Sequence, residues 1–285
     1  MKTIKNILFL LLAIMAVTSC SKDDTEIIEE TVDPMATYNL IKALDYTDHV
    51  IEIYSEKEAL TVGYNPMFIR IKDKIAGSYI SNPNLSWKPM MHMETMMHSA
   101  PASEISGSAY PTVFSGYIIF QMPGNATEYW DITLNYTVAG VDMTKTVRID
   151  VVMPSDGLKK SQVFMGSDDV RYILAYVDPK MPQVTVNDFT AVLYKMEDML
   201  TFSVVENYKI AVDPRMPGMG NHSSPNNQDL TYMDADKMYH GKLSLTMTGY
   251  WRINLKLMNE AGDVLKGEDV TDTNTESSLY FELEL

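Results

Sequence analysis

The chain has 285 residues and is acidic, with 23 Lys and Arg against 38 Asp and Glu and a formal net charge of −15. Phosphate backbones repel such a chain, so nucleic acid is excluded as a partner. The single cysteine, Cys20, excludes an intrachain disulfide and a metal site of several thiolates.

The first segment predicts a signal peptide of the lipoprotein type. Residues 1–6 carry two lysines and no acid, residues 7–17 are apolar, and two small polar residues precede Cys20. The apolar run is short for a membrane span, and small residues before a lone cysteine are typical of lipoprotein processing. We expect cleavage after residue 19 and lipid on Cys20. The alternative is an ordinary signal peptide in which the cysteine is incidental.

Residues 20–37 predict a flexible acidic tether, because they are rich in Asp and Glu and lack hydrophobic periodicity. The start of the tether, Cys-Ser-Lys-Asp-Asp, resembles the acidic signal that sends lipoproteins of the Bacteroidetes to the outer face of the outer membrane. That resemblance implies an outer-membrane, lipid-anchored protein at the cell surface. The other possible location is the periplasmic face.

The rest of the chain predicts an all-β fold of two immunoglobulin-like β-sandwich domains in tandem. Its segments alternate apolar and polar residues, favour β-branched and aromatic side chains, and lack long helical periods with caps. Several short strands per copy of about a hundred residues are typical of such sandwiches. We expect the first sandwich at 38–153, a linker at 154–168 and the second sandwich at 169–285. The expected strands are 50–54, 68–71, 117–122, 130–136, 146–152, 172–177, 189–194, 200–205, 208–212, 243–247, 251–257 and 280–285.

Matching segments in the two expected sandwiches predict an internal duplication. Residues 53–61 align with 193–201, and residues 68–73 align with 208–213 at the same offset. Farther on, a Gly-led segment at 115–122 matches 240–247, and each copy then reaches a Tyr-Trp pair, Tyr129-Trp130 and Tyr250-Trp251. The alignment requires an insertion after residue 73 in the first copy.

Methionine and histidine gather just before the Gly-led segment in both copies. The candidate ligands are Met90, Met91, His92, Met93, Met96, Met97 and His98 in the first copy, and Met216, Met219 and His222 in the second. Thioether sulfur is soft and uncharged, so it binds Cu(I) better than hard cations, and imidazole can complete such a site. Prolines flank the first cluster, which favours a surface loop. The sequence therefore predicts copper, as Cu(I), as the ligand.

Other interpretations of these clusters remain open. Methionine fills irregular cores, so a Met-rich stretch can be packing, and an exposed one can be a protein-contact patch or an oxidant trap. The glycines of the second cluster fit an ordinary loop. Trp130 and Trp251 fit core tryptophans better than ligand platforms. His240 fits a surface residue, and His49 has no suitable neighbours in the sequence.

The order of these motifs resembles the YtkA-like and FixH-like domains. The shared pattern is an early strand pair, a Met-rich loop that ends in His-Ser-Pro, a Gly-led strand that ends in Met, and a Tyr-Trp strand. Those domains are small immunoglobulin-like modules of bacterial envelopes that are linked to copper handling or oxidase assembly. The resemblance implies metal ligation by Met90, Met91, Met93, Met96, Met97 and His98, and by Met216, Met219 and His222. FixH-like proteins carry a membrane helix where this chain has a lipid anchor, so the resemblance favours copper handling over oxidase assembly.

Two functions follow as alternatives, neither of them enzymatic. No Ser-His-Asp set, phosphate loop or distinctive carboxylate pair is evident, and a thioether centre is poor at making hydroxide. The first function is an envelope lipoprotein that binds Cu(I) for copper buffering or transfer, with the membrane and a copper-receiving envelope protein as partners. The second is a cell-surface adhesion or glycan-binding lipoprotein with no metal, because tandem β-sandwiches also serve that role.

Overall fold

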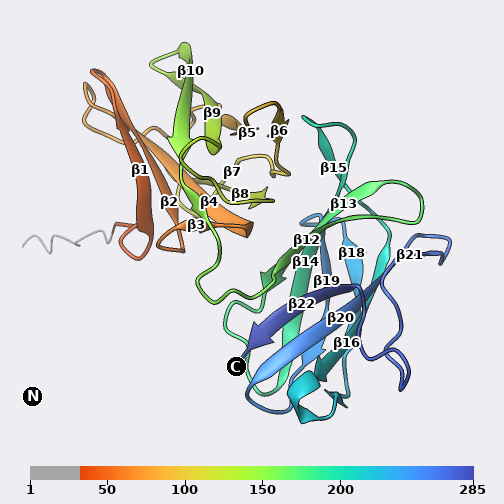
Figure 1. Ribbon diagram of the computed structural model, residues 1–285. Coiled ribbons are helices and arrows are strands. Elements are labelled where there is room, and N and C mark those ends of the chain that lie inside the picture. Colours follow the sequence, from red (N-terminus) through yellow and green to blue (C-terminus); the bar gives the residue numbers. More distant parts are fainter. Residues whose placement is uncertain (1–32) are drawn as a thin grey trace, which may run out of the picture. The chain divides into compact units, whose positions relative to one another are not determined.

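The computed structural model describes residues 33–285, which are nearly all β-structure (Figure 1). No strand pairing joins a residue before 153 to a residue after 160 in this part of the chain. The strands of the first half are β1 (Asn39–Asp45), β2 (His49–Ser55), β3 (Leu60–Thr61), β4 (Gly63–Asp73), β5 (Ser86–His92), β6 (Met97–Ser99), β7 (Ser106–Gly107), β8 (Phe114–Phe120), β9 (Tyr129–Val138), β10 (Val141–Ile149) and β11 (Val151–Val152).

The second half has a similar number of strands and, within residues 33–285, the one 3₁₀ helix, η1 (Pro217–Met219). Its strands are β12 (Ser161–Met165), β13 (Arg171–Asp178), β14 (Val186–Met196), β15 (Phe202–Val204), β16 (Lys209–Met216), β17 (His222–Ser223), β18 (Gln228–Met233), β19 (Met238–Ser244), β20 (Tyr250–Met258), β21 (Val264–Lys266) and β22 (Leu279–Glu284).

The first half is a sandwich of two sheets. One sheet has the order β1-β2-β4-β8-β7 and the other has the order β10-β9-β5-β6, while β3 and β11 form a short parallel pair. Side chains alternate along β4 between buried and partly exposed positions, as a strand with one covered face requires. The core between the sheets includes Ile51, Ile69, Phe120 and Trp130, all essentially inaccessible to solvent. The prediction of an all-β, immunoglobulin-like fold is confirmed.

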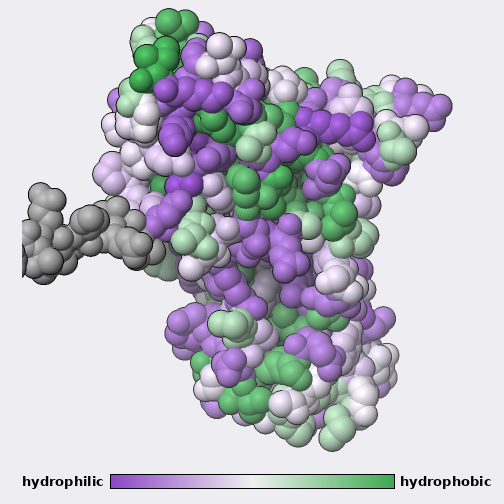
Figure 2. All heavy atoms as spheres, turned by 90° about the vertical axis from the view of Figure 1, so that its left-hand side faces the viewer, coloured by the Kyte–Doolittle hydropathy of each residue, from purple (hydrophilic) through white to green (hydrophobic). Residues whose placement is uncertain are grey.

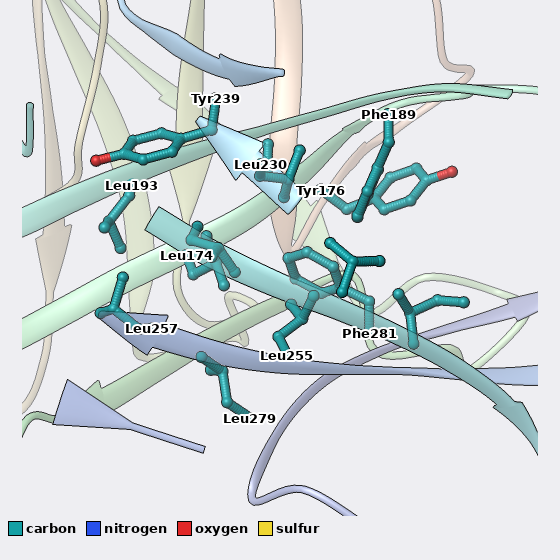
Figure 3. Packing of buried hydrophobic residues seen from close by; sticks show 14 of the residues in the cluster. Leu174, Tyr176, Phe189, Leu193, Leu230, Tyr239, Leu255, Leu257, Leu279 and Phe281 are labelled. Atoms are coloured by element: carbon teal, nitrogen blue, oxygen red, sulfur yellow. The ribbon is translucent and has the colours of Figure 1, made fainter. Parts of the chain in front are cut away.

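In the second half one continuous sheet folds over its own core. β18 pairs with β19 on one side and with β16 on the other, so it joins the two layers. Figure 3 shows the leucines and aromatic rings of this core, with the hydroxyl groups of Tyr176 and Tyr239 at its margin. Tyr176 Oη donates to Pro179 O (2.7 Å) and Tyr239 Oη donates to Val205 O (2.9 Å), so neither hydroxyl is buried without a partner.

β13 is buried on both faces along six consecutive residues. Leu174 and its alternate neighbours face the core of the second half, whereas Ile173, Ala175 and Val177 belong to a second apolar cluster. That cluster also contains Tyr117 and Ile119 of β8, from the first half. We call it the bridging cluster, because it packs the outer face of one sandwich against the other.

A buried hydrogen bond lies inside the bridging cluster. Tyr117 Oη and Tyr194 Oη are 3.0 Å apart, and burial, followed by the neighbouring phenol, raises the pKa of Tyr117 far above its usual range. Both hydroxyls therefore stay protonated, and one can donate to the other. The bond satisfies polar atoms that an apolar contact would otherwise leave unpaired.

The strand order corrects the early part of the predicted duplication. The series β2-β4-β8 in the first half corresponds to β13-β14-β19, and β10-β9-β5-β6 corresponds to β22-β20-β16-β17. Residues 115–122 and 240–247 are therefore equivalent, as expected, because they start in β8 and β19. Residues 68–73 and 208–213 are not equivalent, because β4 matches β14 and β16 matches β5. Short segments that alternate apolar and polar residues resemble one another. The sequence comparison therefore paired β4 with the counterpart of the next strand, β5.

Two predicted boundaries also differ from the structure. The expected linker, 154–168, contains β12, which pairs with β13 along five residues. The expected tether, 20–37, already contains a packed residue, because Met35 is buried with Tyr54 and Val113. The signal peptide and Cys20 lie outside the described residues.

The described surface mixes polar and apolar side chains. Figure 2 shows hydrophobic residues in small groups among hydrophilic ones on the face that it presents. Several large apolar side chains are more than half exposed, including Leu40, Ile75, Val141, Met153 and Met181. Such scattered apolar residues are ordinary on a soluble surface.

The bridging cluster makes a testable contribution to stability. Replacing Ile119, which is completely buried, by Ala should lower the free energy of unfolding by about 2–5 kcal/mol, because it removes apolar contact and leaves a cavity. Urea denaturation measures this change. The exposed Val141→Ala is the matched control and should cost far less. An Ile119→Ala protein as stable as the control would mean that the two halves do not pack together in solution.

Candidate metal centre

The first Met-His cluster forms a β-hairpin rather than a surface loop. In β5 and β6, Met91 lies opposite His98, and on the other side of β5 the same Met91 lies opposite Trp130 of β9. Directly opposed residues point to the same face of a sheet. His98, Met91 and Trp130 therefore share the inner face, and we call them the first His-Met-Trp row.

The two rings of this row converge over Met91. β6 and β9 lie on opposite sides of β5, so their backbones are about 10 Å apart. The ring centroids of His98 and Trp130 are nevertheless only 5.4 Å apart and nearly perpendicular, at 87°. Met91 and Trp130 are inaccessible to solvent, whereas His98 is partly exposed. The histidine is thus the member of the row that lies at the surface.

The hydrogen bond of His98 fixes which ring nitrogen is free. His98 Nδ1 is 2.8 Å from Ser99 O, and a carbonyl oxygen only accepts, so Nδ1 carries the hydrogen. In the neutral ring Nε2 then keeps its lone pair. A histidine held in this way through its other nitrogen is the usual arrangement at metal sites.

Met93 lies at the open end of the row. It follows Met91 by two residues, just beyond the end of β5, and its side chain packs partly buried against the same core. Met93 N donates to Met96 O (2.9 Å) and closes the hairpin turn. Met96 is 47% exposed, so the turn carries a thioether at the surface beside Met93.

The remaining predicted ligands of the first cluster face the other way. Met90, His92 and Met97 lie on the outer face of the same sheet, since they alternate with Met91 and His98. His92 Nε2 donates to Asp131 Oδ2 (2.7 Å), and its ring stacks on Tyr129 at 4.8 Å. One ion cannot contact all seven predicted residues, because the sheet separates them. The sequence could not show this, because it does not reveal which cluster residues are paired in strands.

The second cluster repeats the row. Met216 of β16 lies opposite His222 of β17. On the other side of β16, Arg215 lies opposite Arg252 of β20, so the next residue, Met216, is level with Trp251. His222, Met216 and Trp251 form the second His-Met-Trp row. Met216 is only 5% exposed, His222 is exposed, and Met219, on η1, is 59% exposed. The expectation of a surface position is therefore wrong for Met91 of the first cluster, and Met216 of the second cluster is likewise buried against its core.

The two tryptophans are anchored identically. Trp130 Nε1 donates to Met122 O (2.9 Å), and Trp251 Nε1 donates to Met247 O (3.0 Å). Both acceptors follow the Gly-led strand of their copy. The prediction of core tryptophans is correct, since both are completely buried, but it missed that the ring of Trp130 also contacts His98. The Tyr-Trp repeat was the only trace of this role in the sequence.

The other histidines lie apart from the rows. His49 is buried between Asp48 and Tyr136, with its nitrogens 2.7 Å and 2.8 Å from their oxygens. His240 Nε2 is 2.8 Å from Asp236 Oδ2. No group of three or more His, Cys, Asp or Glu side chains suited to a metal occurs within residues 33–285. Within that part of the chain, metal candidates therefore depend on thioethers.

A cleft of about 640 Å³ lies elsewhere, beside the β2–β3 turn. Lys57 Nζ donates there to Thr61 Oγ1 and Tyr64 O, both at 2.9 Å. Burial, and then the nearby Lys160, lower the pKa of Lys57 to about 8. Acidic and basic side chains both line the cleft, so the cleft favours neither cations nor anions.

Comparison with known proteins does not assign a family. No protein-family model matches the chain, and no curated protein matches it. Among solved structures, the Escherichia coli adhesin FdeC aligns with 82% of this chain and 63% of its own, at 12% identity and a TM-score of 0.25. A DUF4785 family protein from Legionella pneumophila aligns with 77% of this chain and 56% of its own, at 10% identity and a TM-score of 0.27. The chain thus spans less than two thirds of either protein, and scores this low do not indicate a shared function.

Proposed function

We propose that this protein is a membrane-anchored envelope lipoprotein that binds Cu(I) at its two His-Met-Trp rows, for copper buffering or transfer. The observation that carries the proposal is the recurrence of the row. In each half a histidine on a two- or three-residue strand faces a buried methionine at the level of a buried tryptophan.

Packing alone explains only part of each row. Burial of a methionine beside a tryptophan is ordinary core packing, since thioethers favour aromatic contacts. The histidine opposite that methionine is partly exposed in the first row, where it contacts the edge of the core, and exposed in the second, so core packing does not require a histidine at either position. In the first row the histidine also presents a free Nε2, because Nδ1 is bonded to Ser99 O. Recurrence of the histidine at matched positions favours ligation over packing.

The chemistry of the row favours Cu(I). Its donors are a neutral thioether and a neutral imidazole, which suit a soft monovalent ion and not a hard divalent one. The tryptophan ring adds an electron-rich face that attracts cations. Met93, at the open end of the first row, offers a second thioether. A copper-receiving envelope protein with similar soft donors could take the ion from this end.

The anchor and the location belong to the same proposal. Cys20 carries the lipid and the outer membrane holds it, with the protein on the cell surface or on the periplasmic face. In residues 33–285 no helix is long and apolar enough to cross a membrane.

Copper binding is tested by titration of the detergent-solubilised protein with Cu(I) against a chromophoric chelator. The wild type should bind two ions, and Met93→Leu combined with His98→Leu should bind one. Met216→Leu combined with His222→Leu should likewise bind one. Met153→Leu, at an exposed position outside the rows, is the control and should bind two. Zn(II) uptake should be weak throughout, because thioethers discriminate by softness.

Stability separates ligation from packing in the same variants. Met→Leu conserves volume and should change the free energy of unfolding by less than about 1.5 kcal/mol. Variants that keep full Cu(I) uptake but lose stability would show that the methionines only pack. A wild type that takes up no Cu(I) would refute the proposed function.

The anchor has its own test. Cys20→Ser should release the protein from the membrane fraction, because the thiol that carries the lipid is gone. Fractionation followed by immunoblotting measures the release. Persistence of the Cys20→Ser protein in the membrane fraction would contradict lipid anchoring.

Adhesion or glycan binding without metal is the second candidate function. The observation that favours it is the cleft beside Lys57, whose volume suits a small ligand and whose charged rim offers many hydrogen-bond groups. Binding of the protein to a glycan array, lost in Lys57→Met but kept in the two row variants, would favour this candidate. An array without hits would remove its support.

A further inference from the structure

We infer that Met199, from the second half of the chain, supplies a further thioether to the metal site of the first half. The inference rests on the proposed function of the first His-Met-Trp row. It assigns a ligand that lies a hundred residues beyond the Met-His cluster and outside both predicted clusters.

The hairpin formed by β5 and β6 has a free edge. β6 is the last strand of its sheet, so its outward backbone groups have no partner within that sheet. Ser99 N, which directly follows His98, donates to Met199 O at 2.8 Å. Strands joined by such bonds run about 5 Å apart, so Met199 lies alongside the residues of β6.

The segment that carries Met199 is held in place by several hydrogen bonds. The residues between β14 and β15 form a tight turn, in which Glu197 N donates to Thr201 O at 3.0 Å. Leu200 N donates to Asp198 Oδ1 at 2.7 Å, so a side chain fixes the tip as well. The turn is thus held against β6 by its own bonds and by the bond to Ser99.

The side chain of Met199 is partly covered although it lies in a turn. Met199 is 39% exposed, so most of its surface is covered, whereas Met181, in another connection of the same half, is 81% exposed. Ser99 is only 3% exposed although it lies on an edge strand. The turn therefore covers the edge of β6 directly after His98.

A further thioether would complete the donor set of the first row. The tryptophan closes the inner side of the first row, while the edge of β6 is the side from which another donor can approach. Methionine has a long, unbranched side chain that adapts to irregular positions, so it can reach a ligand next to its own backbone. A sulfur there makes the donor set softer and raises the preference for Cu(I).

Met199→Leu tests the inference in the complete, detergent-solubilised protein. Because the bond to Ser99 uses the backbone of Met199, the substitution removes the sulfur and keeps the contact. Cu(I) affinity of one of the two sites should fall about tenfold or more, the scale of changes around metal ligands. Met233→Leu, equally conservative and 48% exposed on β18, should leave both affinities unchanged.

Methionine methyl spectra give the second readout. In protein labelled with ¹³C at the methionine methyl groups, Ag(I), a redox-inert substitute for Cu(I), should shift the resonance that Met199→Leu removes. Two bound ions in the wild type, with an unchanged Met199→Leu affinity and an unshifted Met199 methyl group, would overturn this inference and leave the proposed function intact. A wild type that binds no Cu(I) would refute the proposed function, and this inference with it.

Discussion

The structure depends on two strands that are buried on both faces. β13 and β14 give alternate residues to the core of the second half and to the bridging cluster, so one pair of strands serves two apolar contacts. An ordinary sandwich strand keeps one polar face. A strand with two apolar faces needs a second apolar surface to cover the outer face. Tyr117 and Ile119 of the first half provide that cover for β13 and β14. The contact between Ser99 and Met199 follows from this packing, because the two halves must meet before the β14–β15 turn can reach β6.

The paired tryptophans explain why the rows recur. Each indole is fixed twice, by complete burial and by a bond to the carbonyl of the methionine after the Gly-led strand. Each position in a strand ladder has one residue opposite it on the neighbouring strand. A fixed tryptophan therefore determines which residue of that strand lies beside it. The residue opposite Trp130 is Met91, and the residue level with Trp251 is Met216. The duplicated fold therefore carries a duplicated environment, independent of what occupies it.

Sequence patterns predicted the long strands well, because alternation of apolar and polar residues reports directly on one-sided burial. Segments 130–136 and 251–257 fall within β9 and β20. β5 was missed, because prolines and methionines favoured a loop there, and β12 was missed because its polar neighbours favoured a linker. Of the candidate site, the residue types could be predicted, but the division of the first cluster between two faces could not. That division depends on which residues lie opposite one another across strands, and Met199 has no local pattern at all.

The bond between Ser99 and Met199 also affects how neighbouring copies of the chain can pair. Lipid anchoring would concentrate copies of the chain in two dimensions, where an open strand edge is a template for pairing with a neighbouring molecule. β6 is such an edge, and it is only three residues long. Because Met199 of the same chain already bonds to this edge, a neighbouring copy cannot pair with β6 there. The duplication thus supplies each molecule with its own protection against intermolecular strand addition.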